Sequence, residues 1–184
     1  MDYFKQQRQS FIEMGKVYFY TATINNWMQL LADDEPKQII IDSLKYLSDL
    51  EKINVYGLVI MPNHIHLIWQ TLELNGKETA QGSLMKHTAH AFKKYIKAAK
   101  PNELKLYEVE AANKNYEFWQ RDSLAFELNN RTTALQKLNY IHQNPLAKHW
   151  RLADEPLAYA YSSAQFYENG KNDFGFLKNL MEVF

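Results

Sequence analysis

The sequence predicts an α+β fold: a ferredoxin-like antiparallel sheet with helices packed on one face, plus a late helix after the sheet. Three observations lead to this prediction. The segments follow in the order strand, helix, strand, strand, helix, short strands and helix. Pro62-Asn63 separates the two adjacent strand segments and is a turn signal, which indicates a hairpin. Of the 184 residues, 46% are hydrophobic, enough for one folded domain over residues 1–184.

The first half of the chain supplies three strands and one helix. Residues 16–24 are rich in β-branched and aromatic side chains, which indicates a strand. The acidic stretch that ends at Pro36 is typical of a helix start. Residues 54–61 and 64–72 form the predicted hairpin, which we expect to supply the central strands of the sheet. The apolar positions at helical spacing are Ile39, Ile40, Leu44, Leu47 and Leu50.

The second half begins with a long helix over residues 83–100, which Pro101 ends. Short strands are expected at 104–109, 116–119 and 125–128. Two further helices are predicted at 132–143, where Asn144-Pro145 ends the helix, and at 162–168.

The composition excludes several classes of protein. There is no cysteine, so disulfides, thiolate zinc sites and cysteine nucleophiles are excluded. No apolar run approaches the ~20 residues that span a membrane, and Met1 to Gln6 do not begin a secretory signal. We therefore expect a cytoplasmic protein without a membrane partner. The formal net charge is zero, which argues against a non-specific coat on duplex DNA and leaves a local basic groove open.

A pair of histidines is the most informative chemical feature. His64 and His66 lie two positions apart on a predicted strand, so both side chains point to the same face of the sheet. Ile65 and Leu67 point the other way, into packing. Because imidazole is a common metal ligand, the pair predicts a metal site; two hydrogen-bonded or surface histidines are the alternative.

The late helix carries a second group of polar residues. Tyr140 and Asn144 are four positions apart and share one face of that helix. A tyrosine hydroxyl can act as a covalent nucleophile, and an amide oxygen suits a hard divalent ion. The structural alternative is that Tyr140 packs against Leu135 and Leu138, while Asn144 forms the turn before Pro145.

Together these two segments resemble a known family. The run from Val59 to Ile68 contains His64-Ile65-His66 and is similar to the His-hydrophobe-His (HUH) motif of single-tyrosine transposases that act on single-stranded DNA. The segment Tyr140-Ile141-His142-Gln143-Asn144-Pro145 resembles the tyrosine helix of the branch called REP-associated tyrosine transposases. Phe118-Trp119-Gln120-Arg121 and Tyr161-Ser162-Ser163-Ala164 also resemble segments of that branch, so the likeness covers residues 17–167.

The resemblance implies a site and a reaction. A divalent metal ion, magnesium (Mg²⁺) or manganese (Mn²⁺), is expected on His64, His66 and Asn144. Asn144 stands where the insertion-sequence branch usually has glutamine. Tyr140 is expected to attack a phosphate of single-stranded, hairpin-bearing DNA and to form a 5′-phosphotyrosine, which makes the protein a DNA endonuclease and strand transferase. Family members often form a homodimer, and the tyrosine helix acts within its own subunit or in the partner's site.

A DNA-binding surface is expected on the helix over residues 83–100, where lysines gather in an otherwise neutral protein. A solvated lysine face is the alternative. Trp69, Trp119 and Trp150 are candidates for stacking on unpaired bases, although core packing explains each of them more simply. The candidate phosphate-binding residues are Lys86, Lys93, Lys94, Lys97, Arg121 and Arg131.

Two other functions remain open at this point. The first is a domesticated relative that binds hairpin DNA without cutting it. The second is a ferredoxin-like domain whose histidine pair binds a metal or a small molecule. Convergence of Tyr140, Asn144 and both imidazoles on one pocket favours the enzyme over the small-molecule domain.

Overall fold

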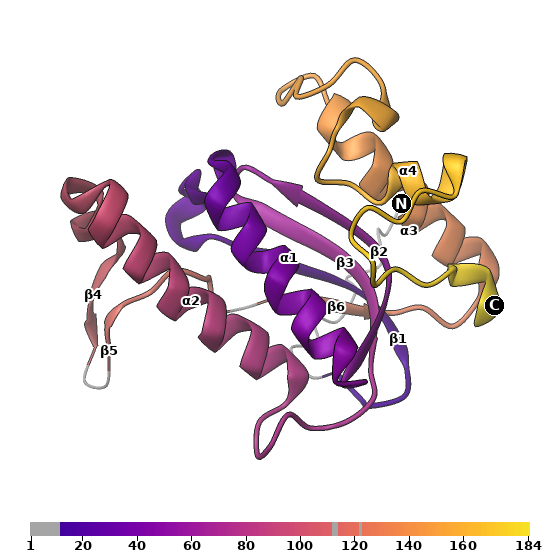
Figure 1. The fold of residues 1–184 in the computed structure, drawn as a ribbon, viewed down its shortest axis with the longest axis horizontal. Coiled ribbons are helices and arrows are strands. Elements are labelled where there is room, and N and C mark those ends of the chain that lie inside the picture. Colours follow the sequence, from indigo (N-terminus) through magenta and orange to yellow (C-terminus); the bar gives the residue numbers. More distant parts are fainter. Residues whose placement is uncertain (1–11, 112–113, 122) are drawn as a thin grey trace, which may run out of the picture.

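A four-stranded antiparallel sheet forms the centre of the molecule (Figure 1). The computed structural model describes residues 12–111, 114–121 and 123–184. The strand order is β2-β3-β1-β6, which with helices α1 and α2 gives the βαββαβ connectivity of a ferredoxin-like fold. The predicted fold class is therefore confirmed. The strands are β1 (Val17–Thr23), β2 (Ile53–Met61), β3 (His64–Thr71) and β6 (Leu124–Glu127).

Only one strand of the predicted hairpin is central. β3 lies between β2 and β1, whereas β2 is an edge strand of the sheet, so the expectation of two central hairpin strands was wrong. The reason is that β1 pairs with the free edge of β3 along its whole length. The outer edge of β2 is covered by the C-terminal part of the chain, where the amide of Ile60 donates to the Tyr161 carbonyl and the amide of Ser163 donates to the Leu58 carbonyl.

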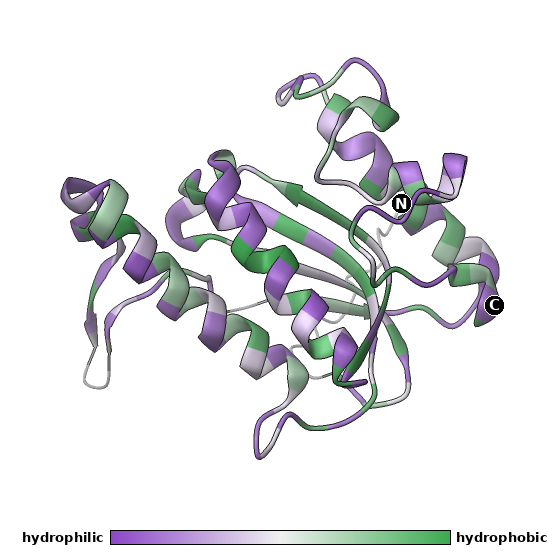
Figure 2. Ribbon diagram, in the orientation of Figure 1, coloured by the Kyte–Doolittle hydropathy of each residue, from purple (hydrophilic) through white to green (hydrophobic). Residues whose placement is uncertain are grey.

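Helices α1 (Asp34–Asp49) and α2 (Ala80–Ala99) pack side by side on one face of the sheet (Figure 1). Hydrophilic and hydrophobic bands alternate along both helices, as expected for amphipathic helices with one buried face (Figure 2). The Thr79 side chain caps α2 by accepting from the amide of Gly82, so this helix begins three residues earlier than predicted. The core under the two helices contains Ile65, Leu67 and Trp69 of β3.

Helix α3 (Arg131–Gln143) packs on the opposite face, against β2 and β3. The Asn130 side chain caps it by accepting from the amide of Thr133. A Cβ atom on Gly57 of β2 would lie 3.0 Å from methyl carbons of both Leu138 and Ile141. The absence of a side chain at Gly57 thus lets α3 sit directly on the backbone of β2, which fixes the position of Tyr140.

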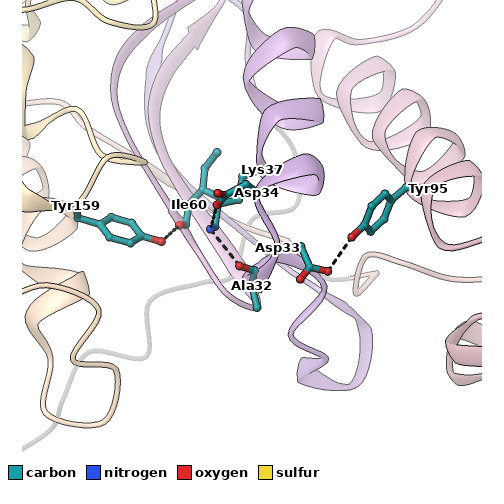
Figure 3. A network of polar contacts seen from close by, with 7 residues as sticks. All are labelled: Ala32, Asp33, Asp34, Lys37, Ile60, Tyr95 and Tyr159. Atoms are coloured by element: carbon teal, nitrogen blue, oxygen red, sulfur yellow. Dashed lines mark hydrogen bonds and ion pairs between the residues drawn. The ribbon is translucent and has the colours of Figure 1, made fainter. Parts of the chain in front are cut away.

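Polar contacts tie the helices and the C-terminal part of the chain to one end of the sheet (Figure 3). The Tyr95 hydroxyl of α2 donates to Asp33 at the start of α1, over 2.9 Å. Lys37 of α1 donates to the Ala32 carbonyl and to Asp34. The Tyr159 hydroxyl donates to the Ile60 carbonyl over 2.7 Å, which attaches the C-terminal part of the chain to β2.

The region between α2 and β6 departs from the prediction. Residues Pro101–Tyr107 form a 3₁₀ helix, and the short strands that follow, β4 (Glu108–Ala111) and β5 (Lys114–Tyr116), form a separate two-stranded ribbon. Pro101 favours the first turn of a helix, which explains why a 3₁₀ helix begins there.

The C-terminal part of the chain contains one further helix, α4, which spans Ala164–Asn169. The remaining 3₁₀ turns are Asn25–Trp27, Leu30–Ala32, Asn144–Leu146, Pro156–Ala158 and Leu180–Glu182. None of the described helices is both long and apolar enough to cross a membrane.

Candidate functional site

His64 and His66 project from β3 on the same face of the sheet as α3, with ring centroids 4.7 Å apart. Ile65, between them, is fully buried on the other face. The alternation of side chains along the strand therefore places both imidazoles together, as the spacing predicted.

His66 lies deeper than His64, with 5% of its surface exposed. Its Nδ1 atom forms a 2.7 Å hydrogen bond with the Thr21 hydroxyl of the neighbouring strand. Its Nε2 atom is buried and has no hydrogen-bond partner among the described residues. Burial lowers the pKa of His66 to about 3, with smaller contributions from His64 and Lys137, so the ring is neutral at pH 7. A buried nitrogen without a partner on a neutral imidazole fits a metal ligand.

His64 is oriented by its neighbour Asn63, whose Oδ1 atom accepts from Nδ1 of the imidazole over 2.7 Å. Because an amide oxygen only accepts, Nδ1 holds the proton and Nε2 keeps its lone pair. Burial lowers the pKa of His64 to about 4, and His149 adds to this effect. Both histidines are thus in the protonation state that binding a metal requires.

Tyr140 lies beside this pair in the same chain. Its ring centroid is 5.4 Å from that of His66 and 6.0 Å from that of Phe19 on β1. Half of the Tyr140 surface is exposed, 50%, although its neighbours on α3, Leu138 and Ile141, are buried. One side of the Tyr140 ring thus packs against Phe19 and His66, and the rest of the side chain is exposed beside the histidine pair.

A cleft of about 480 Å³ brings together three of the four predicted site residues, and His66 lies beside it without lining it. His64, Tyr140 and Asn144 line it, and Asn144 is itself buried at the end of α3. Gln143 lines the same cleft. Among the described residues, no three His, Cys, Asp or Glu side chains gather in a way that would hold a metal ion. The amide of Asn144, the third ligand that the sequence predicts, lines the same cleft as His64.

Comparison with solved structures shows which known fold this chain shares. Over 95% of this chain and 92% of the other, the structure superposes with a TM-score of 0.63 on a REP-associated tyrosine transposase solved with a bound REP hairpin, at 17% sequence identity. This chain has the fold of a REP-associated tyrosine transposase. A Deinococcus radiodurans R1 protein assigned provisionally as a transposase matches with a TM-score of 0.44 and 16% identity, over 75% of this chain and 96% of its own. No protein-family model and no curated protein matches the sequence.

The expected DNA-binding residues on α2 lie apart from the histidine pair. Those on α2 belong to the face of the sheet opposite to the one that carries His64, His66 and Tyr140. Lys86 forms an ion pair with Glu78, Arg121 forms one with Glu117, and Lys93 lies 4.4 Å above the Tyr116 ring. Arg131 begins α3, on the same face as the pair. The remaining two, Lys94 and Lys97, are exposed on α2.

Of the three tryptophans considered for base stacking, two are buried in the core and one lies near the histidine pair. Trp69 and Trp119 are buried in the core, where the Trp119 indole donates to the Thr88 hydroxyl, so neither can stack on a base. Trp150 is partly buried and lies 6.0 Å from the His64 ring. His142, which faces away from Tyr140, is buried and bonded to Ser163 over 2.9 Å.

Two residues of the site were missed from the sequence. The ammonium of Lys137 lies 4.7 Å above the Phe19 ring and 6.0 Å from the Tyr140 ring. Its position three residues before Tyr140 puts it on the same helix face, a signal that was present in the sequence. Trp27 lines the cleft from the loop after β1, and no sequence pattern links it to His64 or Tyr140.

Proposed function

We propose that this protein is a DNA strand transferase that cuts and rejoins single-stranded, hairpin-bearing DNA through a 5′-phosphotyrosine on Tyr140. The observation that carries the proposal is the convergence of Tyr140 with His64 and Asn144 on one cleft, in a chain with the fold of a REP-associated tyrosine transposase. That transposase was solved with a REP hairpin, which supports hairpin DNA as the substrate class here.

His64, His66 and Asn144 would hold a divalent ion, Mg²⁺ or Mn²⁺, which when bound would polarise the phosphate and stabilise its charge. The neutral imidazoles and the unpartnered Nε2 of His66 fit this role. Nitrogen ligands with one amide oxygen suit several divalent ions, so the identity of the metal is a matter for experiment.

The protein groups have separate tasks in the reaction. Tyr140 loses its hydroxyl proton, and the phenolate oxygen forms a bond to the phosphorus. The bond from phosphorus to the 3′ oxygen breaks, and that oxygen takes up a proton and leaves as a free 3′-hydroxyl. Attack by a 3′-hydroxyl on the phosphotyrosine reverses these steps and rejoins strands without nucleotide hydrolysis.

Lys137 supplies a positive charge beside Tyr140. Its ammonium lies 4.7 Å from the Phe19 ring and 6.0 Å from the Tyr140 ring, and it contributes to the lowered pKa of His66. Among the described residues, no carboxylate forms an ion pair with it. We assign it to the scissile phosphate, whose charge increases during attack, and to the phenolate of Tyr140.

The test is formation of a covalent adduct with a hairpin oligonucleotide that carries single-stranded tails, with Mn²⁺ present. Wild type should form an adduct that survives denaturing electrophoresis, and Tyr140→Phe should form none while binding the oligonucleotide. Tyr46→Phe is the matched control, since Tyr46 is similarly exposed but lies on α1, away from the site. An adduct in Tyr140→Phe would refute the assignment, and binding without any adduct in wild type would favour the domesticated binding protein.

A further inference from the structure

Trp27 is the most exposed large apolar side chain of the described residues, at 63%. It lies on the loop after β1 and lines the cleft that Tyr140, His64 and Trp150 also line. An exposed tryptophan does not gain the free energy that burial of its ring would give. Its position in the cleft beside Tyr140 makes it a candidate for burial by a bound ligand.

The backbone is unusual at Trp27 and at the residue that follows Trp150. Four non-glycine residues of the described chain have a positive φ angle, and three of them are Asn26 (54°), Trp27 (56°) and Arg151 (47°). A left-handed conformation at a bulky residue is costly, and such residues persist where the surrounding structure holds them. Strained backbone therefore occurs at or next to both tryptophans that line the cleft.

The structure holds both residues in place. The Trp27 carbonyl accepts from the Asn63 amide group over 3.4 Å, and Asn63 also orients His64. The amide of Trp150 donates to the Ala147 carbonyl over 2.7 Å, and the Trp150 ring lies 6.0 Å from the His64 ring. The positions of both tryptophans are thus linked to the histidine that faces the cleft.

We propose that Trp27 and Trp150 form a stacking site for an unpaired base of the DNA strand, next to the phosphate that Tyr140 attacks. This inference rests on the function proposed above. Indole rings stack well on unpaired bases of any sequence. None of the described residues that line the cleft is acidic, so no carboxylate there repels the phosphate backbone of DNA. The exposed amide of Gln143 is available to the edge of a base.

A base is favoured over a protein partner by location. Trp27 shares its cleft with the candidate nucleophile, and a protein docked over Trp27 would cover Tyr140, which needs access to DNA. A stacked base beside Tyr140 has the opposite effect, because it holds the adjoining phosphate in register for attack.

The test separates stacking from phosphate binding. The probes are a hairpin with random-sequence single-stranded tails and the same hairpin with abasic tails, which carry the same charge. Binding is measured in the Tyr140→Phe background, so that no cleavage occurs. The variants Trp27→Ala, Trp150→Ala and Trp27→Phe are compared with Tyr46→Ala, a matched exposed aromatic on α1.

The tails with bases should bind at least about 5-fold more tightly than the abasic tails. Trp27→Ala and Trp150→Ala should each reduce this ratio, Trp27→Phe should keep most of it, and Tyr46→Ala should leave it unchanged. A ratio that is the same in all variants overturns the stacking site. A Trp27→Ala variant that changes the oligomeric state but not the ratio would instead identify a protein interface and also overturn it.

The outcome is independent of the adduct assay. A wild type that forms no adduct refutes the proposed reaction, whether or not the tryptophans bind a base. A wild type that forms the adduct, with a binding ratio that Trp27 and Trp150 do not affect, refutes the stacking site alone. Failure to bind either hairpin overturns both.

Discussion

The hydroxyl of Thr21 and Nδ1 of His66 form a 2.7 Å hydrogen bond across the β1–β3 pair, in which the two residues are directly opposed. If Nε2 of His66 binds a metal, Nδ1 must carry the proton and donate a hydrogen bond to the Thr21 hydroxyl oxygen. Partners of this kind fix the orientation and tautomer of a ligating imidazole.

Thr21→Val should therefore weaken Mn²⁺ binding by about 10- to 100-fold, because the methyl group that replaces the hydroxyl cannot accept a hydrogen bond from Nδ1–H of His66. Thr21→Ser keeps the hydroxyl and should bind nearly as well as wild type. Mn²⁺ affinity is measured by electron paramagnetic resonance without DNA. Wild-type affinity in Thr21→Val would show that this bond does not orient a metal ligand.

The tyrosine should act within its own chain, because the ring centroids of Tyr140 and His66 of one chain are 5.4 Å apart. A mixture of Tyr140→Phe and His66→Ala proteins should form no adduct, since no chain in it contains both residues. The homodimer expected from the resemblance is compatible with this result. Recovery of adduct in the mixture would show that the tyrosine helix serves a partner subunit.

Lys137→Gln should slow adduct formation on the order of 100-fold, because a positive charge beside the developing phosphate charge is lost. Lys137→Arg should retain most of the rate. Lys45→Gln, an exposed lysine of α1 on the other face of the sheet, is the control and should react like wild type. Single-turnover rates at saturating DNA provide the measurement, and equal rates for Lys137→Gln and wild type would exclude this role.

Gly57→Val should lower the free energy of unfolding by about 1–3 kcal/mol, because the new side chain collides with Leu138 and Ile141 of α3. Urea unfolding measures this change. In a Gly57→Ala protein, Leu138→Ala should cost less than it does in wild type, because it removes one of the two close contacts. Strictly additive costs would show that α3 is not seated by this contact.

Asp33 should stabilise the fold at neutral pH through its link to α2 (Figure 3). Its hydrogen bond with Lys100, and that with Tyr95, hold the pKa of Asp33 below its ordinary value of 3.8. The contribution is thus complete above pH 3.8 and is lost as the pH falls through the lower folded-state pKa.

Asp33→Asn should consequently cost less than about 1 kcal/mol at pH 7, since both partners of the Asp33–Lys100 pair are about a third exposed and screened by solvent. The difference from wild type should shrink toward pH 2, which urea unfolding across this range measures. Asp42→Asn, an exposed carboxylate on α1 that accepts from Gln38, is the control. A difference that is constant with pH would contradict the linkage.

The sequence by itself determined most of the helices and strands and the pairing of the two imidazoles on one face. Strand periodicity is two, so His64 and His66 had to share a face once β3 was assigned. Helical spacing likewise put Tyr140 and Asn144 on one side of α3. These are local rules, and they hold because backbone geometry alone decides where neighbouring side chains point.

Only the tertiary structure decided which face of the sheet α3 covers and what it meets there. Local spacing is silent on contacts between distant segments, so the pairing of Thr21 with His66 and the meeting of Tyr140 with that ring depend on strand order and on Gly57. The same applies to Trp27, which reaches the cleft through a strained loop. It also applies to the α2 lysines, which packing placed on the far face of the sheet.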